Sequence, residues 1–356
     1  MKQLIPFLVA LFTLQTSTAQ TPAELVQEYG KAFPKQTELA IAVIEGDKVS
    51  YYGFIKKDSS FEAKKNASAI FEIGSITKVF TSTLLAHQVV NKKMKLDQLV
   101  KKHLPFKLKG NPKITLKSLS NHTSGLPRLP DNLFPMMVNN PDNPYKGYDV
   151  AKLKEYCTKQ LSLQSAVGER SDYSNLGAGL LGYAIAQKTK KSYETLLQEF
   201  IFIPLEMHQS TTNRSLVEGK LVRGLSPDGQ ITSNWDLEAL APAGNILSSV
   251  DDLSKFILAN FDTKNPVYQL QQSKTMSLHT NMDVALAWHI ITTKTGKKLH
   301  WHNGGTGGYT ASMAMDVDHK KGLVLLSNVS AFHPKTGNID ALVFKWMETL
   351  EKPTEE

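Results

Sequence analysis

The chain has 356 residues, of which 41% are hydrophobic and 21% charged, so it is long enough to bury a substantial core in two lobes. Its formal net charge of +8 includes short lysine pairs such as Lys56/Lys57, a pattern typical of a solvated surface, so we expect no nucleic-acid partner. The single cysteine, Cys157, excludes an intrachain disulfide. Leu153 and Tyr156 flank it at helical spacing, which predicts a buried helix residue rather than a nucleophile.

The first residues follow the order of a secretory signal peptide. Lys2 precedes an apolar run over 4–14, and a small polar stretch over 15–20 contains Ala19. The apolar run is too short to cross a bilayer about 30 Å thick, which needs about 20 residues. We therefore predict that residues 1–20 are a removable signal peptide, that the protein is periplasmic or secreted, and that it has no transmembrane anchor.

The next segments combine helix and strand patterns. Apolar residues at helical spacing predict a helix over 22–35. Two β-rich runs over 39–44 and 49–55 flank Glu45-Gly46-Asp47-Lys48, which predicts an antiparallel hairpin. The run over 79–90 is long and apolar without alternation, so it favours a buried helix.

The middle of the chain, 81–284, alternates helical stretches with prolines and long loops, which predicts an α-rich lobe. Strand patterning returns in the tail, over 288–293, 299–303, 312–317 and 323–328, before a final amphipathic helix over 339–350. Strands at both ends around a helical middle predict an α+β fold, with one antiparallel sheet built from both chain ends and flanked by helices. The predicted sheet domain comprises 21–80 and 285–356, and the inserted α-rich domain comprises 81–284.

The first candidate catalytic pair is Ser75 and Lys78, at the start of the predicted buried helix. Residues three apart share one helix face, so the lysine amine can reach the serine hydroxyl. A serine hydroxyl becomes a good nucleophile only when a neighbouring base takes its proton. Ser75 is the only serine in the chain with lysine three residues later. The alternative is an N-cap serine followed by an ordinary lysine.

The second candidate element is Tyr173-Ser174-Asn175, in a polar loop before a helical run. A tyrosine beside a cationic amine loses its proton more easily, so we expect Tyr173 to act as a base toward serine and an acid toward the leaving group. Asn175 has both a donor and an acceptor, suited to orienting a lysine amine and a substrate amide. The alternative is a loop tyrosine that packs on the core.

The third candidate element begins at His302-Asn303 and continues with Gly304, Gly305, Thr306, Gly307 and Gly308, at the end of a predicted strand. Small residues let a substrate approach the backbone, and the amides of Gly305 and Ser75 could together form an oxyanion hole. Four glycines among so few positions also fit a flexible loop.

Several other motifs need a structural interpretation. Lys-Thr-Gly occurs twice, at 294–296 in a predicted hairpin turn and at 335–337 before the last helix, and neither leads into the glycine segment. The glycines at 177–182 fit G-x-G-x-x-G, but no strand precedes them, so we expect helix packing rather than a dinucleotide site. The ten histidines show no metal-ligand spacing, which predicts no metal and structural roles for His122 and His103.

Together these motifs make the sequence resemble the class C β-lactamase family, which includes D-alanyl-D-alanine peptidases, esterases and aminopeptidases. FEIGSITK at 71–78 is similar to the active-site octapeptide, Tyr173-x-Asn175 to the second motif, and His302-x-Gly304 to the histidine form of the third. The resemblance continues through KLD at 95–97, NHTSGLP at 121–127 and PAGNILSSVDDLSKF at 242–256.

The resemblance implies a covalent acyl-enzyme without a metal or cofactor. Ser75 is then the nucleophile, Lys78 and Tyr173 transfer protons, and the Ser75 and Gly305 amides form the oxyanion hole. Substrate contacts are expected from Asn175, His302, Asn303, Gly304 and Gly305. In β-lactamases of the family the third motif usually reads Lys-Thr-Gly, so His302 here removes a permanent cation that would bind a substrate carboxylate. An imidazole of pKa about 6.5 in its place would bind carboxylates better as the pH falls.

The predicted function is therefore that of an exported serine hydrolase acting on β-lactams or D-Ala-D-Ala-type peptides. The alternatives are an esterase or D-aminopeptidase of the same fold, or a catalytically silent relative that binds cell-wall peptides or penicillin. The intact set of Ser75, Lys78 and Tyr173 favours an enzyme. We expect a monomer whose partner is a small-molecule or peptide substrate, and loops at 127–150 and 205–240 that shape its pocket.

Overall fold

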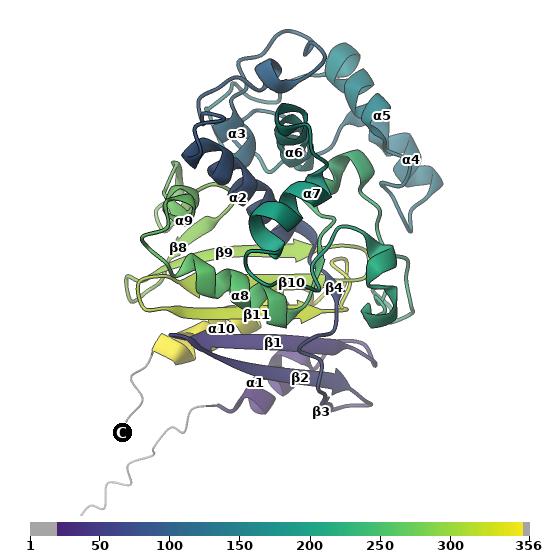
Figure 1. Ribbon diagram of the computed structural model, residues 1–356. Helices are drawn as coiled ribbons and strands as arrows, with labels where there is room; N and C mark the ends of the chain where they lie inside the picture. Colours follow the sequence, from purple (N-terminus) through teal and green to yellow (C-terminus); the bar gives the residue numbers. More distant parts are fainter. Residues whose placement is uncertain (1–19, 352–356) are drawn as a thin grey trace, which may run out of the picture.

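The computed structural model describes residues 20–351, so the predicted signal peptide lies outside the described residues except for Gln20. The main element is a nine-stranded sheet in the order β3-β2-β1-β11-β10-β9-β8-β7-β6, and each neighbouring pair is antiparallel (Figure 1). Its strands are β1 (Glu38–Glu45), β2 (Lys48–Lys56), β3 (Phe61–Ala63), β6 (Met276–His279), β7 (Met282–Val284), β8 (His289–Thr292), β9 (Lys298–Gly305), β10 (Thr310–Asp316) and β11 (Lys321–Ser327). A separate two-stranded ribbon pairs β4 (Phe71–Glu72) with β5 (Leu247–Ser248).

The two ends of the chain meet in the middle of this sheet. Strand β1 pairs with β11 in a register that places Leu39 opposite Ser327, and the β1–β2 hairpin turns where the sequence predicts it. Side chains alternate between the two faces of a strand, and both faces of β1 are buried. The predicted α+β fold, with an antiparallel sheet built from both chain ends, is confirmed.

Helices cover both faces of the sheet. Helices α1 and α10 lie on one face, and α2 and α8 lie on the other (Figure 1). Leu39 and Ile41 belong to the core on the side of α1 and α10, whereas Ala40 and Ala42 belong to the larger core that includes residues of α2 and α8. The helices are α1 (Pro22–Gly30), α2 (Thr77–Val90), α3 (Leu116–Ser120), α4 (Phe134–Asn139), α5 (Val150–Glu155), α6 (Asn175–Thr189), α7 (Tyr193–Leu197), α8 (Val250–Asn260), α9 (Pro266–Gln272) and α10 (Asn338–Glu351).

The first helix ends earlier than predicted, at Gly30 instead of residue 35. Pro34 disfavours helical geometry at the residue before it, and glycine is a poor helix former. The freed carbonyl oxygens are satisfied by Lys56, whose amine donates to the carbonyls of Gly30 and Phe33 at 3.2 and 2.7 Å. A buried lysine of β2 therefore holds the end of this helix against the sheet.

Two short strands extend the sheet into the segment that the sequence analysis assigned to the α-rich lobe. Strands β6 and β7 occupy parts of 276–284 and join the sheet through β8. They are too short for their alternation to stand out in the sequence. The division into two domains at these boundaries stays a prediction.

Two further expectations concern Cys157 and membranes. Cys157 is fully buried beside Tyr156 in one turn of π-helix, and burial raises the pKa of its thiol to about 12, so it is the predicted structural cysteine. Among residues 20–351, no helix has the length and apolar character that a membrane crossing requires.

Candidate active site

Ser75 lies in a short 3-10 turn, Gly74–Ile76, that leads directly into α2. Gly74 has a φ of +50°, which a glycine adopts without the steric cost of a side chain. Ser75 is half-buried, and the Lys78 amine lies 2.9 Å from its hydroxyl oxygen, one turn along the helix. The hydroxyl therefore faces an amine at the N-terminus of a helix, where developing negative charge is favoured.

Lys78 is held in place by the segment over 242–256. Its amine donates to the carbonyl of Ala243 at 2.7 Å, and Thr81, one turn later, donates to the carbonyl of Pro242 at the same distance. The side chain is 2% exposed. Burial, with a smaller contribution from the Arg128 guanidinium, holds the pKa of Lys78 well below its usual value. Lys78 is thus suited to act as a neutral amine that accepts a proton.

Tyr173 completes the group around the serine. Its hydroxyl donates to the Ser75 oxygen at 2.5 Å, from a loop that ends at the N-cap of α6. This loop is fixed by the segment over 121–128: the Ser174 amide donates to His122, and the Ser174 hydroxyl donates to the Pro127 carbonyl. The His122 ring packs 4.6 Å from the Tyr173 ring, centroid to centroid. His122 therefore positions the tyrosine.

The pKa of Tyr173 moves opposite to our expectation. Burial raises it, and the opposing contributions of the Ser75 hydrogen bond and the Arg128 charge are smaller. The expected phenolate required a charged lysine beside the ring, but burial lowers the pKa of Lys78 and so disfavours that charge. Tyr173 consequently keeps its proton and is placed as a donor to the serine oxygen.

The third motif stays in strand β9 as far as its first two glycines, Gly304 and Gly305, and does not form a loop there. Strand β9 continues two residues beyond the prediction, and Gly304 and Gly305 pair with Ala311 and Thr310 of β10. The Thr306 amide donates to the Tyr309 carbonyl, so Gly305 belongs to the next, non-hydrogen-bonded pair of the ladder. Its amide therefore points away from β10, and a Cβ added to Gly74 would lie 2.5 Å from that nitrogen.

His302 faces the same side of β9 as Gly304, but it is a buried and neutral group. It is 1% exposed, one ring nitrogen donates to the Asn303 carbonyl at 2.6 Å, and the other is buried without a partner among the described residues. Burial, followed by the nearby His289 and Lys78, keeps its pKa well below the usual value. The expectation of an imidazole that titrates near pH 6.5 is therefore wrong.

The side chain of Asn303 faces the opposite side of the sheet. It donates to Asp340 of α10 at 2.7 Å, as strand alternation requires for the neighbour of His302. Asn175 begins α6, and its side-chain amide donates to the Tyr145 hydroxyl at 3.2 Å, while its oxygen is buried without a partner among residues 20–351. The expected substrate contact of Asn303 therefore stays a prediction for its backbone rather than its side chain. Asn175 is expected to orient the Lys78 amine, but the one hydrogen bond of its side chain among the described residues goes to Tyr145.

Four residues near the site were missed by the sequence analysis. The guanidinium of Arg128 lies 5.0 Å from the Tyr173 ring centroid. Tyr145, Trp235 and Phe332 form a row of aromatic rings with centroid separations of 5.4 and 6.1 Å. Three of the four come from the 127–150 and 205–240 loops expected to shape the pocket, but no residue pattern identifies them individually.

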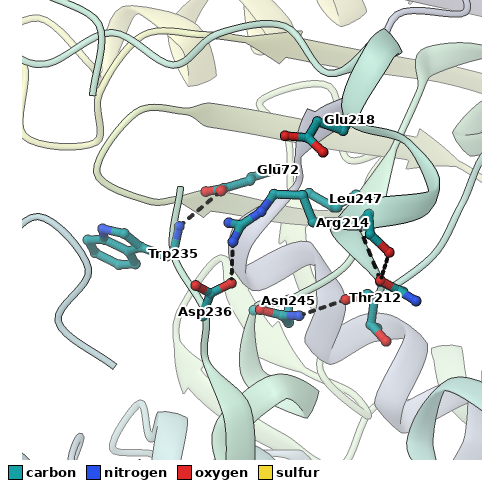
Figure 2. Close-up of a pocket in the computed structure, with 11 residues that line it drawn as sticks. Glu72, Thr212, Arg214, Glu218, Trp235, Asp236, Asn245 and Leu247 are labelled. Carbon is teal, nitrogen blue, oxygen red and sulfur yellow. Dashed lines mark hydrogen bonds and ion pairs between the residues drawn. The ribbon is translucent and has the colours of Figure 1, made fainter. Parts of the chain in front are cut away.

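A polar cavity of about 480 Å³ lies beside the nucleophile turn (Figure 2). The Glu72 carboxylate accepts hydrogen bonds from the Trp235 amide and the Asn234 side chain, and Arg214 pairs with Asp236 at 2.8 Å. Burial raises the pKa of Glu72 to about 6. Neither Ser75, Lys78 nor Tyr173 lines this cavity, so Glu72 acts here as an anchor between the nucleophile segment and the Trp235 loop.

The alternative motifs lie apart from this chemistry or serve packing. Lys294 is in the β8–β9 turn, at the far end of β9 from Gly304. A Cβ on Gly182 would lie 2.3 Å from Pro242, and one on Gly179 would lie 2.5 Å from Leu240, so the glycines of α6 permit close helix packing as predicted. Within residues 20–351, no three His, Cys, Asp or Glu side chains are arranged to hold a metal ion.

Comparison with known proteins gives consistent results. The family model described as Beta-lactamase matches residues 26–344. Protein flp of Staphylococcus aureus strain MW2 is 25% identical over 318 residues, which are 83% of this chain and 60% of flp, so the chain spans well under the full length of that relative. D-alanyl-D-alanine-carboxypeptidase/endopeptidase AmpH of Escherichia coli K12 is 26% identical over 339 residues, 86% of this chain and 84% of AmpH.

Solved structures share the fold. The octameric penicillin-binding protein homologue from Pyrococcus abyssi matches with a TM-score of 0.73 and 24% identity, over 94% of this chain and 76% of that chain. The β-lactamase/D-alanine carboxypeptidase from Yersinia pestis matches with a TM-score of 0.71 and 20% identity, over 92% of this chain and 98% of that one. The sequence match across most of the described residues and the shared fold agree with the motifs, and the chain belongs to the Beta-lactamase family.

Proposed function

We propose that this protein is a serine hydrolase that cleaves a β-lactam or a D-Ala-D-Ala-type peptide through an acyl-enzyme on Ser75. The observation that carries the proposal is the position of the Ser75 hydroxyl, 2.9 Å from a buried amine and 2.5 Å from a phenol. A nucleophile within hydrogen-bond reach of a base and an acid is the arrangement that acyl transfer needs.

In the proposed acylation, the Ser75 oxygen attacks the substrate carbonyl while its proton passes to the neutral Lys78 amine. The Ala243 carbonyl accepts one N–H of Lys78, which leaves the nitrogen lone pair available to the serine. The amides of Ser75 and Gly305 donate to the developing oxyanion. Tyr173 then delivers its proton to the leaving nitrogen and is reprotonated from Lys78.

Deacylation reverses these roles. A water molecule loses a proton to the site and attacks the Ser75 ester, which releases the acid product and restores the serine hydroxyl. Each protein group then regains its starting protonation, and the net reaction adds one water to the scissile bond.

A second candidate function is the hydrolysis of neutral esters. Buried His302 occupies the position that the resemblance assigns to the lysine of Lys-Thr-Gly, and its lowered pKa leaves it without charge at neutral pH. An ester without a carboxylate does not need a cation at this position. We also propose that the protein is exported, because residues 1–20 follow the pattern of a signal peptide.

A substrate panel with a nucleophile variant tests the proposal. The purified enzyme would be assayed on nitrocefin, a D-Ala-D-Ala peptide and a nitrophenyl ester, next to Ser75→Ala and the matched control Ser60→Ala, which alters an exposed turn serine. We expect Ser75→Ala to lose several orders of magnitude of turnover, and intact-protein mass spectrometry to show an acyl adduct on the wild type only.

Two results would go against this function. Substantial turnover by Ser75→Ala would exclude the covalent mechanism. A stable penicillin adduct on Ser75 without turnover of any substrate would instead indicate a binding protein.

A further inference from the structure

We propose that Arg128 binds the carboxylate that the substrate carries next to its scissile amide, and so supplies the cation that His302 does not. This inference rests on the proposed acyl transfer at Ser75, and it names a specificity residue for that reaction. It also chooses a substrate class, namely amides with a neighbouring carboxylate, over neutral esters.

The position of Arg128 places a permanent positive charge beside the reacting groups. Its guanidinium carbon lies 5.0 Å from the Tyr173 ring centroid, and the hydroxyl of that same tyrosine donates to Ser75. The Arg128 side chain is exposed, whereas Lys78 is buried against the same ring with its amine 4.7 Å from the centroid. A ligand that reaches Ser75 therefore passes within reach of an accessible guanidinium.

The backbone of Arg128 is fixed relative to the site, and its side chain is exposed. Its carbonyl accepts hydrogen bonds from the amides of Asn175 and Leu176, at 2.9 and 3.3 Å, in the first turn of α6. The Pro127 carbonyl accepts the Ser174 hydroxyl at 2.6 Å. Arg128 is thus tied directly to the segment that carries Tyr173 and Asn175.

Arg128 also has no competing carboxylate among the described residues. The arginines Arg170 and Arg214 are each paired, with Asp172 and Asp236 respectively, but no Asp or Glu of residues 20–351 forms an ion pair with Arg128. A guanidinium matches the planar geometry of a carboxylate with two parallel hydrogen bonds. An unpaired arginine at the site is therefore available for an anionic group of the substrate.

The basic groups packed around Ser75 and Tyr173, and the lysine of the Lys-Thr-Gly sequence at 294–296, do not offer the same charge. Lys78, His122 and His302 are buried, and burial lowers the pKa of each of them. Lys294 lies at the opposite end of β9, and the seven steps from Lys298 to Gly305 span about 23 Å at 3.3 Å per residue. Arg128, in contrast to these groups, is both exposed and in contact with the Tyr173 ring.

The competing explanation is that Arg128 serves only to position Tyr173 or to modulate its proton. A positioning role would affect all substrates alike, because each needs the same proton transfer. A binding role would affect only substrates with a carboxylate. The ratio of two specificity constants separates these explanations.

The experiment compares an acetylated D-Ala-D-Ala peptide with its C-terminal carboxamide, which keeps the scissile bond and removes the charge. We expect Arg128→Gln to lower the acid-to-amide ratio of kcat/KM by about 10- to 100-fold, the effect of losing a hydrogen-bonded ion pair. Arg128→Lys should recover part of the ratio, because it keeps the charge but not the planar fork. Lys294→Gln removes the same charge far from the site and should leave the ratio unchanged.

The same peptides are also titrated calorimetrically against Ser75→Ala with and without Arg128→Gln, so that binding is measured without turnover. If the acid binds more tightly than the amide, and this preference requires Arg128, the inference is supported. It is supported even if the wild type hydrolyses neither peptide, because a lack of hydrolysis would reject only the proposed function. Equal affinities for acid and amide with Arg128 present, or a ratio of kcat/KM that Arg128→Gln leaves unchanged, would overturn the inference.

Discussion

Gly304 lies against the backbone of Ser75 so closely that a Cβ on Gly304 would come within 2.7 Å of the Ser75 amide nitrogen. The same Cβ would lie 2.0 Å from the carbonyl oxygen of Ile73, a distance that backbone atoms cannot accommodate without moving. The nucleophile turn and β9 therefore meet at a position that only glycine fits. This contact sets the distance between the two amides of the proposed oxyanion hole, those of Ser75 and Gly305.

Gly304→Ala should move β9 away from Ser75 and impair both folding and acylation. Overpacking of this kind costs about 1–3 kcal/mol of unfolding free energy, and a displaced oxyanion donor costs about 100-fold or more in kcat. Gly337→Ala is the matched control, because a Cβ there meets no atom within 4 Å. Urea unfolding and acylation rates check the prediction, and wild-type rates in Gly304→Ala would show that the contact does not set the geometry.

The buried Lys78 should make stability depend on pH in a defined direction. Its folded pKa is lowered, so between that pKa and the unfolded value near 10.4 the unfolded chain binds a proton that the folded protein does not. The free energy of unfolding then rises with pH in this window, by up to about 1.4 kcal/mol per pH unit. Below the folded pKa this stabilisation by the neutral Lys78 is fully lost.

Lys78→Met removes this titration, so its unfolding free energy between pH 7 and pH 9 should rise less steeply than that of the wild type. The exposed control Lys294→Met should keep the wild-type slope. Urea denaturation at three pH values measures both slopes. Parallel curves for wild type and Lys78→Met would mean that Lys78 does not carry the proposed neutral amine.

Local patterns predicted part of this molecule well. The spacing of Ser75 and Lys78 places them one turn apart because a helix fixes such distances locally, and the β-rich runs at 39–44 and 323–328 coincide closely with the two strands that join the chain ends. Protonation states could not be predicted in this way. The charges of Lys78 and His302 depend on burial by segments distant in sequence, such as the Ala243 loop, which the pattern of residues does not reveal.

Arg128 illustrates a second limit of prediction from sequence. It adjoins a motif that the resemblance identifies, but its function depends on the fold that brings 128 beside 173. Asn303 shows the reverse case, since the motif predicts a substrate contact, while strand alternation directs its side chain to Asp340. A motif therefore identifies the segment that forms a site more securely than the side chains that line it.

Activity should persist after metal removal. The proposed nucleophile, base and acid are protein groups already within hydrogen-bond reach of one another, so the reaction needs no bound ion to activate water or serine. We expect kcat/KM on the best substrate of the panel to be the same before and after dialysis against EDTA. Activity lost on chelation and restored by Zn²⁺ would contradict this mechanism.

His302 should not give the enzyme a preference for carboxylates at low pH. Burial keeps its pKa well below 6.5, so it stays neutral from pH 8 down to pH 5.5. Over this range a guanidinium stays charged and a substrate carboxylate stays ionised, so the acid-to-amide ratio of kcat/KM should not change. The two peptides are compared on one enzyme, so that shared titrations cancel. A ratio that rises as the pH falls would show that His302 gains a proton and binds the carboxylate.

His302→Lys should destabilise the protein instead of creating a lysine motif. The new amine would lie at a 1%-exposed position near His289 and Lys78, and no Asp or Glu of residues 20–351 is among the groups that shift the pKa there. Burying an ammonium group forces it to lose its proton, and each unit of pKa depression costs 1.36 kcal/mol, so we expect a loss of about 2–5 kcal/mol at pH 7. The loss should shrink as the pH rises, because the unfolded chain then binds the proton less strongly.

His279→Lys, on exposed edge strand β6, is the matched control and should change stability by about 0.5 kcal/mol or less. Urea unfolding at pH 7 and pH 9 decides the matter, and a His302→Lys variant as stable as His279→Lys at both values would show that position 302 can accept a cation.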